Sequence, residues 1–301
     1  MQTSNEKKTS IQTNDKFKQK PAIIGCTIGS DCTITNIEAL KNIGVTNFQI
    51  LAKFSIRRGV YLPDKRIIEN INGHRVTIHM PFYFHLLQPI SLKYRKYFVS
   101  LNNYWSRIQK RTCVIIHCKG INRSEEFTRN LMFRNMQQYA AMCPNLKILM
   151  ENDAGGRAKP APKLKALAAV RKRLNNNAVY NIGVCVDTEH AYAAGDELFS
   201  LNYRKDVSMV HLNAIPKFVE FGKHLDRHST TPLIESKNGT AFVRKILGLI
   251  KHDVPLVLER TDFNILIKDI KLLKAMQNET LQDVDKKTMG QNFQKKRKIL
   301  L

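Results

Sequence analysis

Residues 182–187 read Ile-Gly-Val-Cys-Val-Asp, an almost wholly apolar run that ends at an aspartate. The run lacks the alternation of apolar and polar residues that marks a half-buried strand. It therefore predicts a strand buried on both faces, as in a parallel sheet covered by helices. Seven further runs of this kind recur along the chain: Ile23–Cys26, Asn47–Leu51, Val76–His79, Cys113–His117, Leu146–Glu151, Val207–Leu212 and Leu256–Glu259.

Segments with the helical spacing of apolar residues lie between these runs and after the last of them. They are Asn36–Ile43, Leu92–Ile108, Glu125–Met142, Leu164–Leu174, Phe242–Ile250 and Phe263–Met276. Alternating strands and helices predict the α/β class. Eight units with no glycine-rich turn of the dinucleotide-binding type after the first strand favour a closed (β/α)₈ TIM barrel over an open doubly wound sheet.

The 301 residues fit one such barrel, and no internal repeat or linker rich in Pro, Gly or Ser divides the sequence. We expect a single barrel domain at residues 21–284, between a flexible basic extension at 1–20 and a basic tail at 285–301. The tail holds Lys295–Lys298 and is a nuclear address, an arm that contacts DNA, or a solvated charged end. The polar N-terminus predicts a soluble intracellular protein, nuclear or cytoplasmic, with no membrane partner.

The charge balance points to a polyanionic partner. The chain has 49 Lys and Arg against 25 Asp and Glu, a net charge of +24. Such an excess favours nucleic acid through counterion release and long-range attraction. The alternative is a basic surface that serves solubility or membrane attraction.

The six cysteines are scattered, several of them in apolar runs, and none forms a C-x-x-C pair. We expect buried, reduced thiols. Cys26 and Cys32 are close enough in sequence for a disulfide in an oxidising environment.

Six of the predicted strands, the third to the eighth, have a residue that can bind a metal at their last position or, in the seventh, one position before it. These residues are His79, His117, Glu151, Asp187, His211 and Glu259. A single His or Glu at a strand end is usually an ordinary hydrogen-bonded side chain. Six together, however, would converge on the rim where barrel active sites are built.

Three further candidates lie just past the strands. His190 follows Asp187 by three residues, and Asp226 and His228 fall in the loop after the seventh strand. Together these three residues can bind one more metal ion. Nitrogen and oxygen ligands without a thiolate suit Zn²⁺, although Mn²⁺ and Fe²⁺ accept the same donors.

The motifs around these residues resemble those of the endonuclease IV family. Val186–Asp196, Val-Asp-Thr-Glu-His-Ala-Tyr-Ala-Ala-Gly-Asp, looks like the family signature that contains Asp-Thr-x-His and Ala-Ala-Gly. Glu151–Gly156, His211–Asn213 and Asp226–His228 resemble its Glu-Asn, His-Leu-Asn and Asp-Arg-His segments, in the family's order. The similarity runs from about Ile23 to about Leu272.

The resemblance implies a xylose-isomerase-like barrel that holds three Zn²⁺ ions, with Mn²⁺ possible at one or more sites. It implies base excision repair, in which duplex DNA is cut 5′ to abasic sites to leave a 3′-hydroxyl and a 5′-deoxyribose phosphate. The first ion would be held by His79, His117 and Glu151, the second by Glu151, Asp187, His211 and Glu259, and the third by His190, Asp226 and His228. Glu259 or Glu151 would assist in deprotonating the attacking water, and we expect a monomer.

The resemblance also assigns DNA contacts to the loops after the second and third strands and to the Asp-Arg-His segment: Lys53, Arg57, Arg58, Phe82, Tyr83 and Arg227. Ordinary loop packing is the alternative for the aromatic residues. Phe82 stands where a tyrosine is expected, Ala214 replaces an aspartate, and residues 231–233, Thr-Pro-Leu, replace a glycine-containing stretch. No ligand is lost, but the groups that orient ligands and DNA differ from the family pattern.

Two other functions remain open at this stage. A sugar isomerase or epimerase can share the barrel and a divalent metal at the same rim, because a fold does not dictate its chemistry. A DNA-binding protein without catalytic activity can keep the fold. A third ion-binding set and the +24 charge weigh against the isomerase, and an intact ligand set weighs against the inactive protein.

Overall fold

The computed structural model describes residues 22–28, 32–55, 59–61, 65–82, 84–108, 112–156, 159–176, 180–223, 231–237, 239–251 and 253–279. For residues 53–55 and 59–61 it describes the backbone alone. The predicted ends, 1–20 and 285–301, therefore lie outside the described residues, and the proposed domain boundaries remain predictions.

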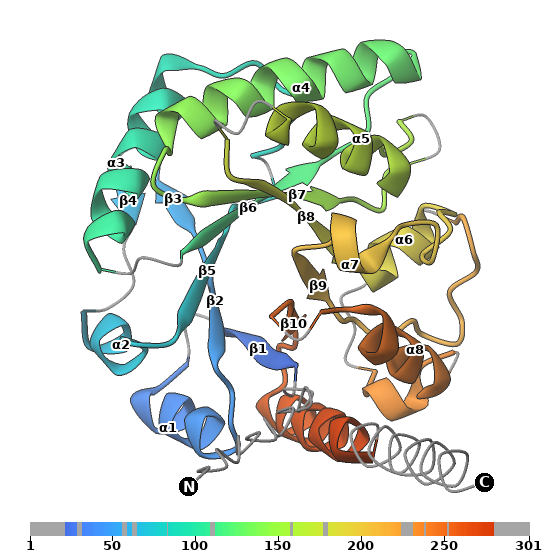
Figure 1. Ribbon diagram of the computed structural model, residues 1–301. Helices are drawn as coiled ribbons and strands as arrows, with labels where there is room; N and C mark the ends of the chain where they lie inside the picture. The colour runs from blue at the N-terminus through green and yellow to red at the C-terminus, as the bar shows by residue number, and fades with distance from the viewer. Residues whose placement is uncertain are drawn as a thin grey trace, which may run out of the picture.

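Eight parallel strands close into a barrel in the order β1-β10-β9-β8-β7-β6-β5-β2 (Figure 1). The strands are β1 (Ile23–Ile28), β2 (Asn47–Leu51), β5 (Arg75–His79), β6 (Cys113–Cys118), β7 (Lys147–Asn152), β8 (Ile182–Asp187), β9 (Met209–His211) and β10 (Pro255–Leu258). All eight were predicted, with ends that differ by two residues at most. The (β/α)₈ barrel is confirmed.

Helices surround this ring of strands on its outer side (Figure 1). They are α1 (Ile34–Asn42), α2 (Lys65–Asn70), α3 (Leu92–Ile108), α4 (Glu125–Met142), α5 (Leu164–Asn175), α6 (Thr188–Ala193), α7 (Tyr203–Asp206), α8 (Ala241–Leu249), a 3-10 turn at Leu233–Glu235 and a helix over 263–279. The six predicted helices are all present. The sequence analysis missed α2, α6, α7 and the 3-10 turn.

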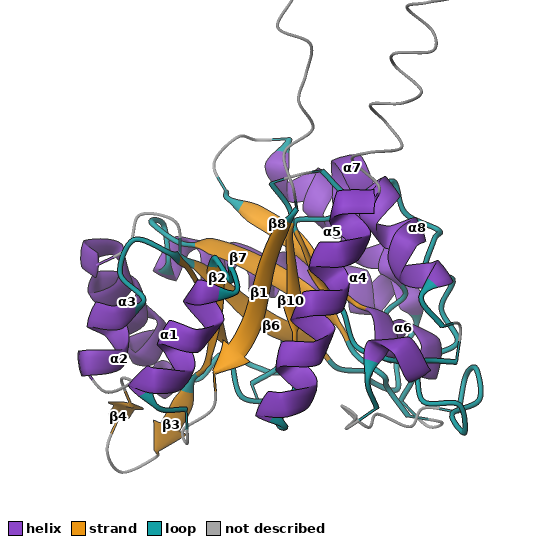
Figure 2. Ribbon diagram, turned by 90° about the horizontal axis from the view of Figure 1, so that it is seen from below, coloured by secondary structure: helices purple, strands orange, loops and turns teal. Residues whose placement is uncertain are grey.

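A two-stranded antiparallel hairpin, β3 (Lys53–Ser55) with β4 (Gly59–Tyr61), is also absent from the prediction. It follows β2 directly and lies beyond the carboxyl ends of the barrel strands (Figure 2). The hairpin therefore lies at the same end of the barrel as the predicted metal ligands.

Side chains alternate along each strand between the barrel interior and the surrounding helices. Ile115, Leu149, Cys185, Met209 and Val257 come from five strands and form a small, fully buried apolar cluster of their own. Their strand neighbours, such as Ile116 and Met150, belong to the main core between strands and helices. The small cluster therefore fills the middle of the barrel and separates its two ends.

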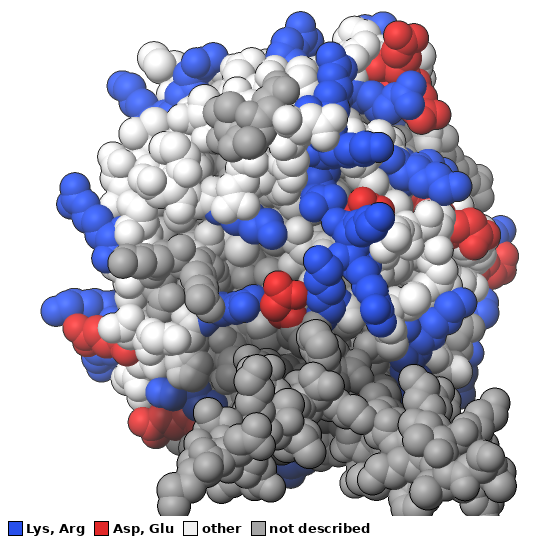
Figure 3. All heavy atoms as spheres, in the orientation of Figure 1, with Lys and Arg blue, Asp and Glu red and all other residues white. Residues whose placement is uncertain are grey.

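The surface carries the predicted excess of positive charge. On the face shown in Figure 3, Lys and Arg side chains outnumber Asp and Glu and are spread over the surface. None of the helices in the described ranges has the length and apolar content that a membrane span requires. The six cysteines are free, so the alternative of a Cys26–Cys32 disulfide finds no support.

Candidate metal centre

The predicted ligands occupy strand positions whose side chains point into the barrel. His117, Glu151, Asp187 and His211 each lie two residues past the member of the central apolar layer on the same strand. His79 is the last residue of β5, and Glu259 directly follows β10. In the strand register His117 is opposite Glu151 and Asp187 is opposite His211. The fold thus brings all six side chains to the carboxyl end of the barrel, as predicted.

Glu151 lies at the centre of this group. Its Oε2 is 3.2 Å from Nε2 of His79 and 3.5 Å from Nε2 of His117. Its other oxygen, Oε1, is 2.7 Å from Nδ1 of His211. The carboxylate is fully buried, and among the described residues Oε2 has no hydrogen-bond donor. A buried oxygen that faces two imidazole nitrogens and lacks a donor is well suited to a cation shared with them.

A second group surrounds His211 on the other side of Glu151. Nδ1 of His211 is 3.3 Å from Oε2 of Glu259 and 3.9 Å from Oδ2 of Asp187. Ligand atoms of Glu151, Asp187, His211 and Glu259 all lie within 4.8 Å of one another, as do those of His79, His117 and Glu151. These two groups can hold metal ions, and they have the same members as the first two predicted ligand sets, with Glu151 in both.

Backbone carbonyls orient two of the histidines. Nδ1 of His79 lies 2.9 Å from the carbonyl oxygen of Met80, and Nδ1 of His190 lies 2.9 Å from that of Asn152. A ring nitrogen that donates to a carbonyl fixes the tautomer and leaves the other nitrogen as the ligand. For His79 that other nitrogen is the Nε2 that faces Glu151.

Gln49 and Asn213 contact the ligands, and the sequence analysis missed both as site residues. Nε2 of Gln49 donates to Oε1 of Glu259 at 2.6 Å. The Oε1 of Gln49 itself is 2.9 Å from Nε2 of His211. Nδ2 of Asn213 donates to Oδ2 of Asp187 at 2.6 Å. Both amides are fully buried. A polar residue at an inward position of the apolar run 47–51 was the signal available for Gln49.

The structure describes only one member, His190, of the third predicted set of metal ligands. The ring of His190 lies 5.7 Å from that of His117, centroid to centroid, and its backbone N–H donates to Oδ1 of Asp187 at 2.8 Å. Asp187 thereby caps α6 as well as facing the metal groups. Asp226 and His228 lie outside the described residues, so the third site remains a prediction.

Charges in the cluster shift two pKa values in opposite directions. Burial alone would raise the pKa of the Glu151 carboxyl, but His117, His211 and His79 hold it well below its usual range. Burial would lower the pKa of His211, but Cys185, Glu259 and Glu151 raise it well above its usual value. The negative surroundings therefore favour a positive charge at this point, whether a proton or a metal ion.

A family model for xylose isomerase-like TIM barrels matches residues 37–277. The chain belongs to this family. A curated relative named probable endonuclease 4, from Campylobacter curvus (strain 525.92), is 28% identical over 182 residues, which cover 54% of this chain and 59% of the relative. The chain thus matches about three fifths of that relative's length. The predicted likeness to endonuclease IV is confirmed.

Two solved structures share the fold. Endonuclease IV from Thermus thermophilus superposes with a TM-score of 0.60 at 20% identity, over 85% of this chain and 99% of that one. The IOLI protein, whose crystal structure has a bound zinc atom, superposes with a TM-score of 0.62 at 12% identity, over 87% and 97% of the two chains. At these identities the likeness concerns the barrel alone.

A cavity of about 850 Å³ opens over the metal groups of this family member. His79, His117 and Glu259 form part of its wall. Phe82 lies at the cavity with 66% of its surface exposed, and Nζ of Lys119 is 4.7 Å from the centroid of its ring. Of the other predicted DNA contacts, the side chain of Lys53 and all of Arg57, Arg58, Tyr83 and Arg227 lie outside the described residues.

Phe82, one of the departures from the endonuclease IV pattern, lines this cavity, but the other two lie away from it. Ala214 and Leu233 are fully buried in the main apolar core, and neither contributes to the cavity wall. Leu233 is held by its backbone N–H, which donates to Oδ1 of Asp269 at 2.9 Å. These substitutions therefore act on loop packing and leave the described ligand groups intact.

Proposed function

We propose that this chain is a zinc-dependent endonuclease of base excision repair. It hydrolyses the phosphodiester bond 5′ to abasic sites in duplex DNA and leaves a 3′-hydroxyl and a 5′-deoxyribose phosphate. The observation that carries the proposal is the convergence of five residues with nitrogen or oxygen ligand atoms on the buried Glu151, beneath a wide cavity that three of them line. The endonuclease name of the curated relative supports the same chemistry.

The donor set fits zinc. Two ligand groups of imidazoles and carboxylates share a buried carboxylate whose Oε2 has no donor among the described residues. A third ion would be held by His190 together with Asp226 and His228, and Mn²⁺ could replace Zn²⁺ at one or more sites. Ions bound there supply hydroxide at neutral pH and neutralise charge on the phosphoryl and leaving oxygens.

Glu259 is the carboxylate best placed to accept a proton from the attacking water. Its side chain is 11% exposed and faces the cavity, whereas Glu151 is fully buried. Gln49 donates to its Oε1, and Nδ2 of Asn213 is 3.2 Å from its Oε2. These donors hold the carboxylate in one orientation. Glu151 contributes by holding the histidines around one buried charge.

The cavity wall suits a DNA backbone with a missing base. Lys119 and Lys159 provide cations for phosphate oxygens, and the exposed ring of Phe82 can insert beside the lesion. An abasic nucleotide costs less to unstack than an intact one, which favours its extrusion from the duplex into the cavity. Arg57, Arg58 and Arg227, which lie outside the described residues, would add phosphate contacts.

Glu259→Gln tests this account. The amide cannot accept the proton, so we expect cleavage of a duplex with one abasic site to fall by roughly 10²- to 10⁴-fold. Zinc content, measured by mass spectrometry on the same samples, separates loss of proton transfer from loss of metal. Glu126→Gln, on the exposed first turn of α4, is the matched control and should change neither. Full activity of Glu259→Gln with normal zinc would exclude an essential role for that carboxylate.

A sugar isomerase or epimerase is the second candidate, because solved structures that share the fold include a D-psicose 3-epimerase. Folded, zinc-loaded protein that leaves abasic duplex uncut would favour it, and conversion of ketohexoses would identify it. A DNA-binding protein without catalytic activity would bind the duplex and purify without stoichiometric zinc.

A further inference from the structure

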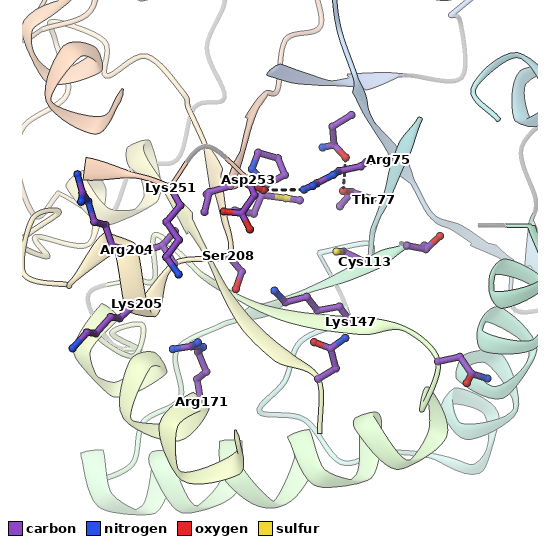
Figure 4. A pocket seen from close by; sticks show the side chains of 18 residues that line it. Arg75, Thr77, Cys113, Lys147, Arg171, Arg204, Lys205, Ser208, Lys251 and Asp253 are labelled. Atoms are coloured by element: carbon purple, nitrogen blue, oxygen red, sulfur yellow. Dashed lines mark hydrogen bonds between the residues drawn. The ribbon is translucent and has the colours of Figure 1, made fainter. Parts of the chain in front are cut away.

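A second cavity, of about 370 Å³, lies at the amino ends of the barrel strands (Figure 4). Lys147 is four residues before Glu151 on β7, and Arg75 is four residues before His79 on β5. Side chains four residues apart on a strand point to the same face, so Lys147 and Arg75 also point into the barrel. They line its opposite end, roughly 13 Å along the strand from Glu151 and His79. The apolar layer of Leu149 and its neighbours separates this cavity from the metal centre.

Positive charge dominates the wall of this cavity. Its cationic side chains are Arg75, Lys147, Arg171, Arg204, Lys205 and Lys251, and its single carboxylate is Asp253. Figure 4 shows Lys147, Arg171 and Lys251 reaching toward the same space from β7, α5 and the segment before β10. Arg204 and Lys205, on α7, lie at its edge.

Little of this charge is neutralised by the protein. Nη1 of Arg75 donates to the backbone carbonyl of Asp253 at 2.8 Å, and Nη1 of Arg171 is 3.5 Å from Oδ1 of Asp206. Neither Lys147 nor Lys251 has a carboxylate within ion-pair distance in the parts of the chain that the structure describes. Burial lowers the pKa of Lys147. The charges of Arg171 and Arg75 lower it further, whereas Cys113 and Asp253 raise it. A cation recessed in this way is unfavourable unless an anion accompanies it.

Neutral donors line the same space. The side chain of Asn47 is 1% exposed, and its Nδ2 has no acceptor among the described residues. The hydroxyl of Ser208 faces the cavity near Lys147 and Lys251 (Figure 4). Ammonium, guanidinium, amide and hydroxyl donors around one concavity form the donor set that recognises phosphate oxygens.

We propose that this cavity binds the phosphate groups of a small, free phosphorylated molecule. Two or three linked phosphates would match the number of cations that converge. A DNA duplex is a poor fit, because Lys147 and Asn47 are recessed inside the end of the barrel, where a wide backbone cannot follow. The site is separate from the proposed nuclease centre, so either can fail without the other.

Titration calorimetry with sodium tripolyphosphate tests the proposal on the full-length protein. We expect Lys147→Met and Lys251→Met each to weaken binding by about tenfold, the effect of losing one charge-assisted contact. Lys172→Met, which removes an exposed cation of α5 outside the cavity, is the matched control and should bind like the wild type. Lys251 lies on an exposed segment, so its variant keeps the test valid if Lys147→Met folds poorly.

Three results would overturn the proposal. Absence of binding by the wild-type protein would remove the site. Equal affinities of all four proteins would assign binding to the metal centre or to the overall charge. Displacement of tripolyphosphate by a short undamaged duplex would show that the site takes backbone phosphates of DNA, whereas persistence of binding supports a small free ligand.

Discussion

Glu151 is the residue on which both metal groups depend. Its two oxygens face different histidines, and the whole side chain is buried. In Glu151→Gln the negative charge is lost and one oxygen becomes an N–H donor, so we expect loss of zinc from both groups, measured by mass spectrometry after dialysis. Glu126→Gln should retain its zinc. A full zinc load in Glu151→Gln would show that this carboxylate is not a shared ligand.

His211 should make zinc uptake dependent on pH. Its pKa is raised well above 6.5, so in metal-free protein the ring holds a proton whose stabilising effect is complete below pH 6.5 and is lost as the pH rises through the raised pKa. Zinc requires the neutral ring, so binding must displace that proton and should tighten as the pH rises over this range. An indicator dye in weak buffer at pH 7 measures the protons released when zinc is added to chelated protein. His211→Gln should release fewer, and an unchanged release would contradict the assignment.

At the scale of elements, packing inside the barrel depends on a glycine of β8. A Cβ on Gly183 would lie 2.4 Å from Oγ of Ser208 and 2.6 Å from Cδ2 of Leu149. We expect Gly183→Ala to lower the free energy of unfolding by about 1–3 kcal/mol, the usual cost of overpacking. Gly248→Ala, where a Cβ meets nothing within 4 Å and the residue lies in α8, should instead raise it by about 0.5–1 kcal/mol. Denaturant titration measures both, and a neutral Gly183→Ala would contradict the tight interior.

The elements that the sequence predicted are those with strong burial signals. Most barrel strands lie in largely apolar runs, and the long helices α3 and α4 have apolar residues at helical spacing, so their bounds were predicted closely. The hairpin of β3 and β4 was missed because three-residue strands contain too few residues to show a pattern. The candidate ligands could be predicted because strand ends and motifs mark them. Gln49 could not, because its role depends on a contact with Glu259, 210 positions away.

At the scale of the whole molecule, the barrel places two kinds of chemistry at its two ends. Carboxylates and imidazoles gather at the carboxyl ends of the strands, and cations gather at the amino ends. Strand alternation produces both arrangements from the same inward positions of β5 and β7. The barrel itself is shared with proteins of other functions, so the activity must follow from the ligands and the cavity rather than from the fold.

Cleavage of a duplex with one abasic site, before and after prolonged chelation, tests whether this chain is a zinc-dependent endonuclease for abasic DNA. We expect incision 5′ to the lesion with a 3′-hydroxyl product, loss of incision on chelation, and recovery when zinc is restored. Undamaged duplex of the same sequence should stay intact. Incision that survives complete zinc removal, or a folded and zinc-loaded protein that leaves the abasic strand uncut, would contradict this function.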